Sequence, residues 1–395
     1  MYGILSTFDV LCGNATYSNF LALSLEQRGH RVRKISLLTE LQKNDSKVVQ
    51  KSVLEEVGRC KIINIQLELG LYGSSPHRSA KFIKKILKAC PEKTTITVHR
   101  VEKRPDSILR KIKKNFLSGT SFAKTVQLAI KDVYLFKVYK GIYSEIRRQA
   151  SKKNIVIIAH TYMDQKKLLR NFNVESTVHP IMWPQHLVGQ QNKINQNLDS
   201  FTVGVFGFIS AHKNFEIVIE AFKNLVEKEI IPDNSTILIC GGHHPEAPTY
   251  GLTYTSARKI KPYPFQLSQY LESMKYSMHK IRVKWIVGST DEEMAVLMSK
   301  VDVTCIPYAE TGQSGSGITS QALQYSRGIA MSDTIMASQH QKLCDGKIIL
   351  FDTASVQSCE TAILSAKEQS LRPKFKNNFA YKNIIDLIEF KKKEN

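Results

Sequence analysis

The stretch Val301–Asp333, VDVTCIPYAETGQSGSGITSQALQYSRGIAMSD, indicates the fold class more directly than any other part of the chain. Its residues 301–306 predict a buried strand, and three glycines among small hydroxyl residues predict a loop into a helix that ends near Arg327. Such a loop leaves several backbone amides without partners, and together with the helix dipole they favour an anion, phosphate above all. An ordinary strand-to-helix turn with a serine cap is the other interpretation.

Strand-like and helix-like segments alternate on both sides of this stretch. Apolar β-branched runs predict strands at 2–6, 32–36, 61–66, 94–98, 155–158, 202–207, 236–240, 283–286, 302–306, 329–331 and 347–350. Most of the intervening segments have helical periodicity, as 19–28 does before Gly29. Repeated strand–helix units imply parallel sheets with helices on both faces, so the fold class is α/β, and the two halves look like one architecture used twice.

The alternation pauses at a polar segment rich in Gln and Asn, which is typical of a linker. A chain of 395 residues also favours two domains over one. We therefore expect an N-terminal domain at 1–185, a linker at 186–200, a C-terminal domain at 201–376 and a last amphipathic helix within 377–395.

Composition narrows the class of protein further. The hydrophobic fraction is 42%, and no apolar run approaches the roughly 18 residues of a membrane span. The first residues predict a strand and not a secretory signal, so we expect a cytoplasmic protein. Seven cysteines are scattered without CxxC pairs, which favours buried thiols over disulfides or zinc.

The net charge of +21 is concentrated in the first half of the chain. Residues 1–200 carry 34 Lys and Arg against 15 Asp and Glu, and segments 101–116 and 121–148 read as basic amphipathic helices. Such helices suit the anionic inner surface of a membrane, to which the protein would bind peripherally. A lysine-rich solvent face over an ordinary core is the other interpretation. Nucleic acid is not expected, because the aromatic residues have core spacing.

In doubly wound sheets, ligands bind beyond the carboxyl ends of the strands, so the residues that follow strands are candidates. In the first half these are Gly13, in the loop after the first strand, then Gln66 and Glu68, and then His99 at the end of a strand. A turn glycine, a polar loop and a structural histidine are the respective alternatives.

In the second half the same position is held by Gly207, Lys213 and Gly241. A lysine near a helix start is not favoured by the helix dipole, but it makes sense beside a bound anion; a surface lysine is the alternative. The pair His243 and His244 has no further ligand at a suitable spacing, and no Asp-x-Asp occurs that would chelate a divalent ion. We therefore expect no metal and no cofactor.

Together these segments resemble the GT-B glycosyltransferases, and specifically the large retaining family 4. Seven segments that match the family follow one another in the expected order over nearly the whole chain. They are CGNATYSNFLALSLEQRGHRV, INIQLELGLYG, TTITVHR, FGFISAHKNFEIVIEAF, TILICGG, WIVGSTDEEMAVLMSKVDVTCIPY and QSGSGITSQALQYSRG.

The resemblance implies two Rossmann-like doubly wound domains that face one another across a cleft, with the final helix crossing back to the N-terminal domain. The C-terminal domain would bind a UDP- or GDP-linked sugar, and the N-terminal domain a glycan or lipid-linked acceptor, with Gln66 and Glu68 on the acceptor side. The reaction would retain the anomeric configuration and serve the synthesis of cell-surface polysaccharide or lipopolysaccharide. The nucleotide-sugar would be a substrate, and no metal would be needed.

The resemblance also assigns roles to single residues. His99 would act at the sugar and Lys213 at the diphosphate, as the catalytic pair. The donor site would contain Gly13, Gly207, Lys213, Gly241, Gln313, Ser314, Gly315, Ser316, Gly317 and Gln321.

Three positions depart from the family's pattern. Gln313 and Gln321 replace two glutamates that are eight positions apart, and Phe208 stands where many relatives have an arginine. These changes keep two alternatives open: a catalytically weak homologue that binds a glycan or a partner, and a nucleotide-sugar epimerase.

Overall fold

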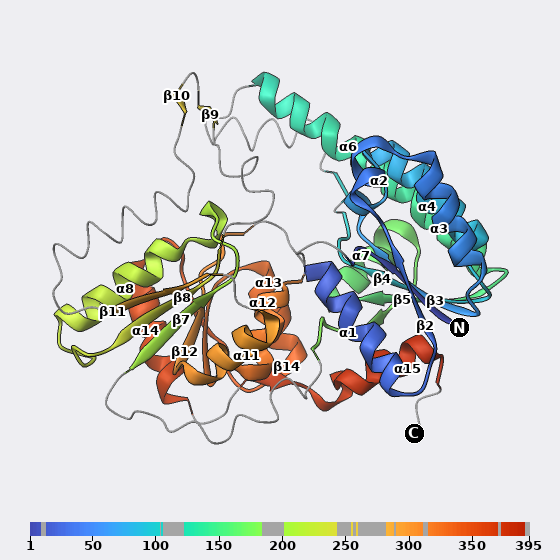
Figure 1. The fold of residues 1–395 in the computed structure, drawn as a ribbon. Coiled ribbons are helices and arrows are strands. Elements are labelled where there is room, and N and C mark those ends of the chain that lie inside the picture. Colours follow the sequence, from blue (N-terminus) through green and yellow to red (C-terminus); the bar gives the residue numbers. More distant parts are fainter. Residues whose placement is uncertain are drawn as a thin grey trace. The chain divides into compact units, whose positions relative to one another are not determined.

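The fold is seen in a computed structural model of the chain (Figure 1). The structure describes residues 1–8, 13–102, 104–105, 122–183, 201–242, 254–255, 258–259, 282–287, 290–310, 315–369 and 373–391. The chain forms two compact units, Met1–Pro180 with Lys382–Asn395, and Ile181–Tyr381. The linker expected at 186–200 lies outside the described residues.

The first unit contains a sheet of six parallel strands in the order β2-β1-β3-β4-β5-β6. Their bounds are β1 (Tyr2–Ser6), β2 (Val32–Ser36), β3 (Ile62–Leu67), β4 (Lys93–Val98), β5 (Asn154–Ala159) and β6 (Thr177–Val178). The order reverses between β1 and β3, as in flavodoxin-like sheets. Most residues of β1, β3 and β4 are buried because helices cover both faces of the sheet, whereas Arg33 and Lys34 of the edge strand β2 are exposed.

Helices α3, α4 and α6 pack together on one side of this sheet, and α1 and α15 lie together on the other (Figure 1). The helices are α1 (Gly13–Gln27), α2 (Thr39–Asn44), α3 (Lys47–Gly58), α4 (Pro76–Ala89), α6 (Phe122–Ala150), α7 (Tyr162–Phe172) and α15 (Tyr381–Glu389). Serines cap two of them: the Ser46 hydroxyl accepts from the Val49 amide at 3.4 Å, and the Ser75 hydroxyl from the Arg78 amide at 3.4 Å.

The second unit also contains six parallel strands, in the order β11-β8-β7-β12-β13-β15. Their bounds are β7 (Thr202–Phe206), β8 (Thr236–Cys240), β11 (Arg282–Ile286), β12 (Val303–Ile306), β13 (Gly328–Ser332) and β15 (Ile349–Phe351). In chain order this is the 3-2-1-4-5-6 arrangement of dinucleotide-binding folds, and the reversal lies between β7 and β12. The two halves therefore share a class but not a strand order.

Helices α8 and α14 pack against one another in this unit, as do α11 and α12. The helices are α8 (Phe215–Glu227), α11 (Asp291–Lys300), α12 (Gly317–Tyr325), α13 (Ile335–Leu343) and α14 (Val356–Glu368). The start of α11 is a capping box between Thr290 and Glu293. Acidic residues in this first turn are favoured by the cap and by the helix dipole.

All eleven strands predicted from the sequence are present, with ends that differ by at most two residues. The expected final helix is present as α15. The prediction omitted strands of two residues, which are too short to show a period. These are β6, β9 (Tyr254–Thr255), β10 (Arg258–Lys259), β14 (Cys344–Asp345) and β16 (Lys374–Phe375).

The described residues include six of the seven cysteines. Six cysteines are free and buried there, which confirms the expectation for Cys60, Cys90, Cys240, Cys305, Cys344 and Cys359. Within the same ranges, none of the helices combines the length and the apolar character that crossing a bilayer requires.

Helix α15 is held in the first unit by a buried carboxylate. The Glu389 side chain is 1% exposed and accepts hydrogen bonds from Arg28 and His30, and Arg28 also binds Asp386 at 2.6 Å. Burial alone would raise the pKa of Glu389, but the bonds from His30, Lys391 and Arg28 outweigh it and lower the pKa. The ionised carboxylate is thus part of the folded state.

We expect Glu389→Gln to lower the free energy of unfolding by about 1–3 kcal/mol at pH 7, because Arg28 and Lys391 lose their charged acceptor. A lowered pKa gives stability that is present above the ordinary value near 4.5 and is lost as the pH falls through the folded value. Urea unfolding should therefore show the difference from wild type shrinking at acid pH. Exposed Glu40→Gln is the control, and an equal loss in both variants would contradict the assignment.

Candidate functional site

The reversal of strand order between β7 and β12 creates a crevice at the carboxyl ends of these strands, where such sheets bind ligands. Gly207 follows β7 with a φ of +107°, a conformation that favours glycine. A Cβ added there would lie 3.1 Å from Ile318 and 3.3 Å from the Tyr308 hydroxyl. Gly207 therefore brings the loop after β7 against the loop after β12 and the first turn of α12.

Lys213 reaches the same place from the short helix η3 (Ala211–Lys213). Its Nζ lies 3.4 Å from the centroid of the Tyr308 ring, a cation–π contact. The Tyr308 hydroxyl donates to the Phe206 carbonyl at 3.2 Å, and the Ala309 amide donates to the His212 carbonyl at 2.8 Å. The two loops are thus fixed to one another by the side chain and by the backbone.

The ammonium group of Lys213 is withdrawn from water at this position. Desolvation lowers its pKa to about 7. No carboxylate among the described residues forms an ion pair with it, although the neighbouring Lys223 on α8 binds Glu220 at 3.5 Å. A desolvated cation without an acidic partner is suited to receive an anion.

The start of α12 supplies backbone donors to the same crevice, since Ile318 and the Tyr308 hydroxyl both lie against Gly207. The Ser316 hydroxyl caps the helix by accepting from the Thr319 amide at 3.3 Å, and the Ser316 carbonyl accepts from the Ser320 amide at 3.0 Å. Within the described part of the chain, the amides of Gly317 and Ile318 have no acceptor. The structure therefore brings together Gly207, Lys213 and the 316–318 turn, while the predicted donor residues Gln313 and Ser314 lie outside the described residues.

Two other predicted donor residues have partners within the protein. Gly241 packs against the loop after β7, because an added Cβ would lie 2.0 Å from the Gly207 carbonyl oxygen. Gln321 is 2% exposed, and its Nε2 donates to the Asp291 carboxylate at 3.0 Å. Both positions thus have a packing role, and their contact with a donor remains a prediction.

A second cluster of predicted residues lies at the carboxyl edge of the first sheet. His99 follows β4, and its Nε2 is 2.6 Å from the Gln66 side-chain oxygen. Its Nδ1 is 3.3 Å from Nε2 of His160, which follows β5 in the same way. Sequence reasoning missed His160, although the rule that selected His99, a polar residue directly after a strand, also applies to it.

The remaining predicted residues of this half have different surroundings. Glu68 is half-buried, and burial raises the pKa of its carboxyl group, with Arg100 opposing and Glu102 adding to the effect. Gly13 is the first residue of α1, and a Cβ added there would meet no atom of the described residues within 4 Å. Packing among these residues therefore does not require a glycine at position 13, and its contact with a donor remains a prediction.

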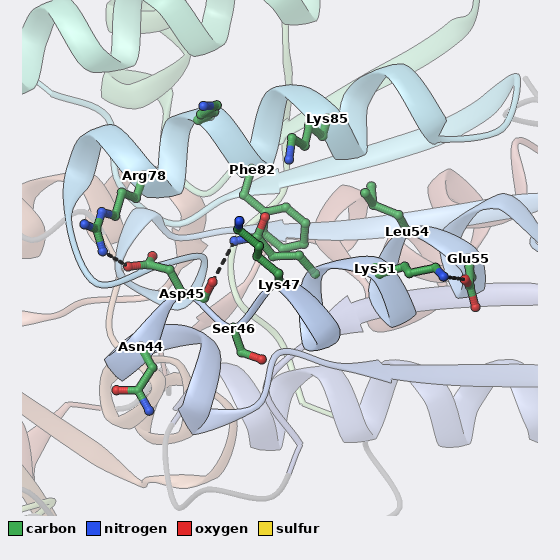
Figure 2. A pocket seen from close by; sticks show the side chains of 12 residues that line it. Asn44, Asp45, Ser46, Lys47, Lys51, Leu54, Glu55, Arg78, Phe82 and Lys85 are labelled. Carbon is green, nitrogen blue, oxygen red and sulfur yellow. Dashed lines mark hydrogen bonds and ion pairs between the residues drawn. The ribbon is translucent and has the colours of Figure 1, made fainter.

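A basic groove lies between α3 and α4 in the first unit (Figure 2). Its floor contains Leu54 and the buried ring of Phe82. Its rim carries five cations, Lys47, Lys51, Arg78, Lys81 and Lys85. Asp45 neutralises Arg78 at 2.6 Å and Glu55 lies 3.9 Å from Lys51, so the rim keeps a positive excess.

The expected basic helix at 101–116 lies mainly outside the described residues. The other basic segment, 121–148, forms most of α6, as the helical periodicity predicted. The structure thus adds the α3–α4 groove to the sequence-based argument for binding to an anionic surface. Periodicity within one segment could not reveal a groove between two helices.

Comparison with known proteins was informative only at the level of structure. No protein-family model matches the chain, and no curated protein matches its sequence. A trehalose-phosphate synthase (UDP-forming) from Burkholderia vietnamiensis matches with a TM-score of 0.58 and 8% identity, covering 99% of this chain and 96% of that one.

Two further solved structures contain bound nucleotides. Anabaena HepE in complex with UDP and glucose has a TM-score of 0.54 and 13% identity, over 98% of this chain and 92% of that one. An E. coli trehalose-6-phosphate protein bound with UDP-2-fluoro glucose has a TM-score of 0.57 and 9% identity, over 99% and 96%. At these identities the likeness concerns the fold, and the chain has the GT-B fold of two parallel-sheet α/β domains that these glycosyltransferase structures share.

Proposed function

We propose that the protein is a retaining glycosyltransferase that moves a sugar from a nucleoside-diphosphate sugar to an acceptor hydroxyl. The observation that carries the proposal is the meeting of Lys213, Gly207 and the 316–318 turn at the strand-order reversal of the second sheet. A desolvated cation beside unpaired helix-start amides is suited to a pyrophosphate. Two structures that share the fold contain UDP or a UDP-sugar.

In such a transfer, the positive charge of Lys213 acts on the departing diphosphate. The bond between the anomeric carbon and the β-phosphate oxygen breaks, and negative charge grows on the departing diphosphate. Lys213 and the amides of Gly317 and Ile318 stabilise that charge, which lowers the barrier to departure. The acceptor oxygen bonds to the anomeric carbon on the same face, and its proton passes to the leaving phosphate. In this proposal no metal is required.

The acceptor in this proposal is a glycan or a lipid-linked glycan of cell-surface polysaccharide or lipopolysaccharide synthesis. Gln66, Glu68 and His99 lie at the carboxyl edge of the first sheet, where an acceptor would be expected. Polar side chains at such an edge orient a sugar through hydrogen bonds to its hydroxyl groups. A sugar phosphate is a second acceptor class, since another match is a synthase in complex with glucose-6-phosphate.

A lipid-linked acceptor would place the protein at an anionic membrane surface. The α3–α4 groove supports this part of the proposal, since cations border an apolar floor there. Each such cation near an anionic bilayer contributes about 1 kcal/mol, while acyl chains or lipid glycerol can contact the apolar floor.

Lys213→Met tests the donor site directly. Purified wild type should be stabilised against thermal unfolding by one member of a panel of UDP-, GDP- and ADP-sugars. The variant should bind that sugar at least tenfold more weakly, because the diphosphate loses its cation. Lys223→Met on α8 is the matched control, since Lys223 already has an acidic partner. Equal stabilisation of Lys213→Met and wild type would remove Lys213 from the site.

The lowered pKa of Lys213 also predicts the direction in which ligand affinity and stability change with pH. The diphosphate of a nucleotide-sugar keeps its charge over neutral pH, whereas Lys213 loses its proton as the pH rises through about 7. Affinity measured by calorimetry should therefore fall by up to tenfold per pH unit above 7. Without ligand, the folded state should gain stability between pH 7 and 10.5, because the unfolded chain there binds the additional proton. Lys213→Met should flatten both profiles; a steep affinity profile in that variant would argue against this lysine.

Reversing the charge of the groove tests membrane binding. We expect replacement of Lys47, Lys51, Lys81 and Lys85 by Glu to weaken binding to phosphatidylglycerol vesicles at least tenfold in a sedimentation assay. Binding of the wild type should fall with added salt, and neutral phosphatidylcholine vesicles should bind poorly. The control reverses four exposed lysines of the second unit, Lys300, Lys342, Lys347 and Lys374. Equal loss in both variants would show only an effect of net charge.

A further inference from the structure

A chain of buried polar side chains runs along one face of the first sheet to His99. Asn64 and Gln66 on β3 are paired in register with Thr95 and Thr97 on β4, and all four are fully buried. Asn64 Nδ2 lies 2.9 Å from the Thr95 hydroxyl and 3.1 Å from that of Thr97, and the Asn64 and Gln66 amides are hydrogen-bonded. The chain continues through the Gln66–His99 and His99–His160 contacts.

The far end of this chain has a fixed polarity. Nδ1 of His160 is 3.0 Å from the backbone carbonyl of His179, which can only accept, so that nitrogen carries a hydrogen. If His160 is neutral, its Nε2 has none and must accept from Nδ1 of His99. A neutral His99 then has a bare Nε2, which faces Gln66.

The position of the hydrogen on His99 determines how the Gln66 and Asn64 amides are oriented at the other end of the chain. Gln66 must offer its NH₂ group to His99, its carbonyl must accept from the NH₂ of Asn64, and the Asn64 carbonyl must accept from the two threonine hydroxyls. Amide oxygen and nitrogen have almost the same shape, so only the hydrogen-bond partners decide their orientation. In this arrangement the Thr95 hydroxyl donates to Asn64 in place of the Ile63 carbonyl, which it reaches at 3.4 Å in the structure, and both imidazoles are neutral.

The opposite polarity is the one seen in the structure: the Gln66 carbonyl faces His99, Gln66 Nε2 donates to the Asn64 side-chain oxygen, and Asn64 Nδ2 donates to the two threonine hydroxyls. Nε2 of His99 then carries the hydrogen, Nδ1 is bare, and His160 must donate to it from Nε2 while still donating to His179 from Nδ1. His160 is then an imidazolium ion. The two polarities therefore differ by one proton.

We propose that His160 is a positioning residue whose protonation decides which ring nitrogen of His99 carries the hydrogen, with the Gln66 and Asn64 amides reversing in step. Among the described residues, the titratable ring of Tyr17 from α1 lies edge-on to both imidazoles at 6.2 Å between centroids, and the backbone carbonyl of His179 after β6 accepts from His160. In the charged polarity the additional proton lies on His160, because His160 then donates from both ring nitrogens.

The consequence for catalysis rests on the proposed function. A sugar hydroxyl that replaces Gln66 at Nε2 of His99 would meet an acceptor when His160 is neutral and a donor when His160 is charged. His99 can thus accept a hydrogen bond from that hydroxyl only in the neutral state. The geometry in the free protein holds whether or not the protein transfers sugars, so the two ideas can fail separately.

The experiment is a pH titration of the ligand-free, full-length protein labelled with ¹⁵N-histidine, followed by two-bond ¹H–¹⁵N NMR of the ring nitrogens. His99→Gln and His160→Gln assign the signals by their disappearance. At pH 8 both rings should carry hydrogen on Nδ1 alone. On acidification the pair should gain one proton, with His160 becoming doubly protonated while the hydrogen of His99 moves to Nε2. A His99 with hydrogen on Nε2 at pH 8, a tautomer unaffected by His160, or a His160 that stays neutral until the protein unfolds would overturn the proposal.

Gln66→Glu gives an independent prediction. A carboxylate can only accept, so it should hold the hydrogen of His99 on Nε2 and raise the pKa of the pair by about one unit or more. His340→Gln is the control: its ring is also buried and its Nδ1 lies 2.9 Å from the Met336 carbonyl, but it belongs to α13 of the other unit. It should leave both signals unchanged. A Gln66→Glu protein with the wild-type tautomer at pH 8 would show that the amide chain does not set it.

Discussion

The proposed donor site of the second unit depends on Lys213, whose desolvated ammonium group lies against the Tyr308 ring. Lys213 has no carboxylate partner among the described residues, and its contact with Tyr308 offsets only part of the cost of desolvation. That cost is tolerated because an anion can repay it. The groups around Lys213 come from different elements: Gly207 follows β7, Tyr308 follows β12, and the first turn of α12 lies against Gly207.

The strand order explains why these groups meet. Residues after β7 and after β12 are about a hundred positions apart in the sequence, but the strands are neighbours in the sheet. Reversal of the order at this pair sends the connecting helices to opposite faces and leaves the crevice open between them. In the first unit the order differs, and the polar residues at the carboxyl edge gather instead after β3, β4 and β5, where Gln66, His99 and His160 lie.

The two units use buried polarity in different ways. In the second, Lys213 has no carboxylate partner among the described residues, and desolvation lowers its pKa to about 7. In the first, polar side chains bond to one another in a continuous chain that ends at the backbone carbonyl of His179. Each hydrogen bond of such a chain has one donor and one acceptor only if all side chains are oriented in the same direction. A proton added at one end therefore changes the donor and acceptor roles at the other end.

The sequence by itself determined the class of fold, the strands and the residues that follow them, because burial on both faces leaves unbroken apolar runs and glycine marks the turns. Lys213, Gly207 and His99 could be found in this way. The positive φ of Gly207 agrees with its selection as a ligand-loop glycine. Tertiary structure alone decided the partners: Tyr308 beneath Lys213, Asp291 beside Gln321 and His160 beside His99. These pairs are separated by 30 to 95 positions, and no periodicity within a segment specifies which strands become neighbours. Strand order does, and it follows from how the whole chain packs.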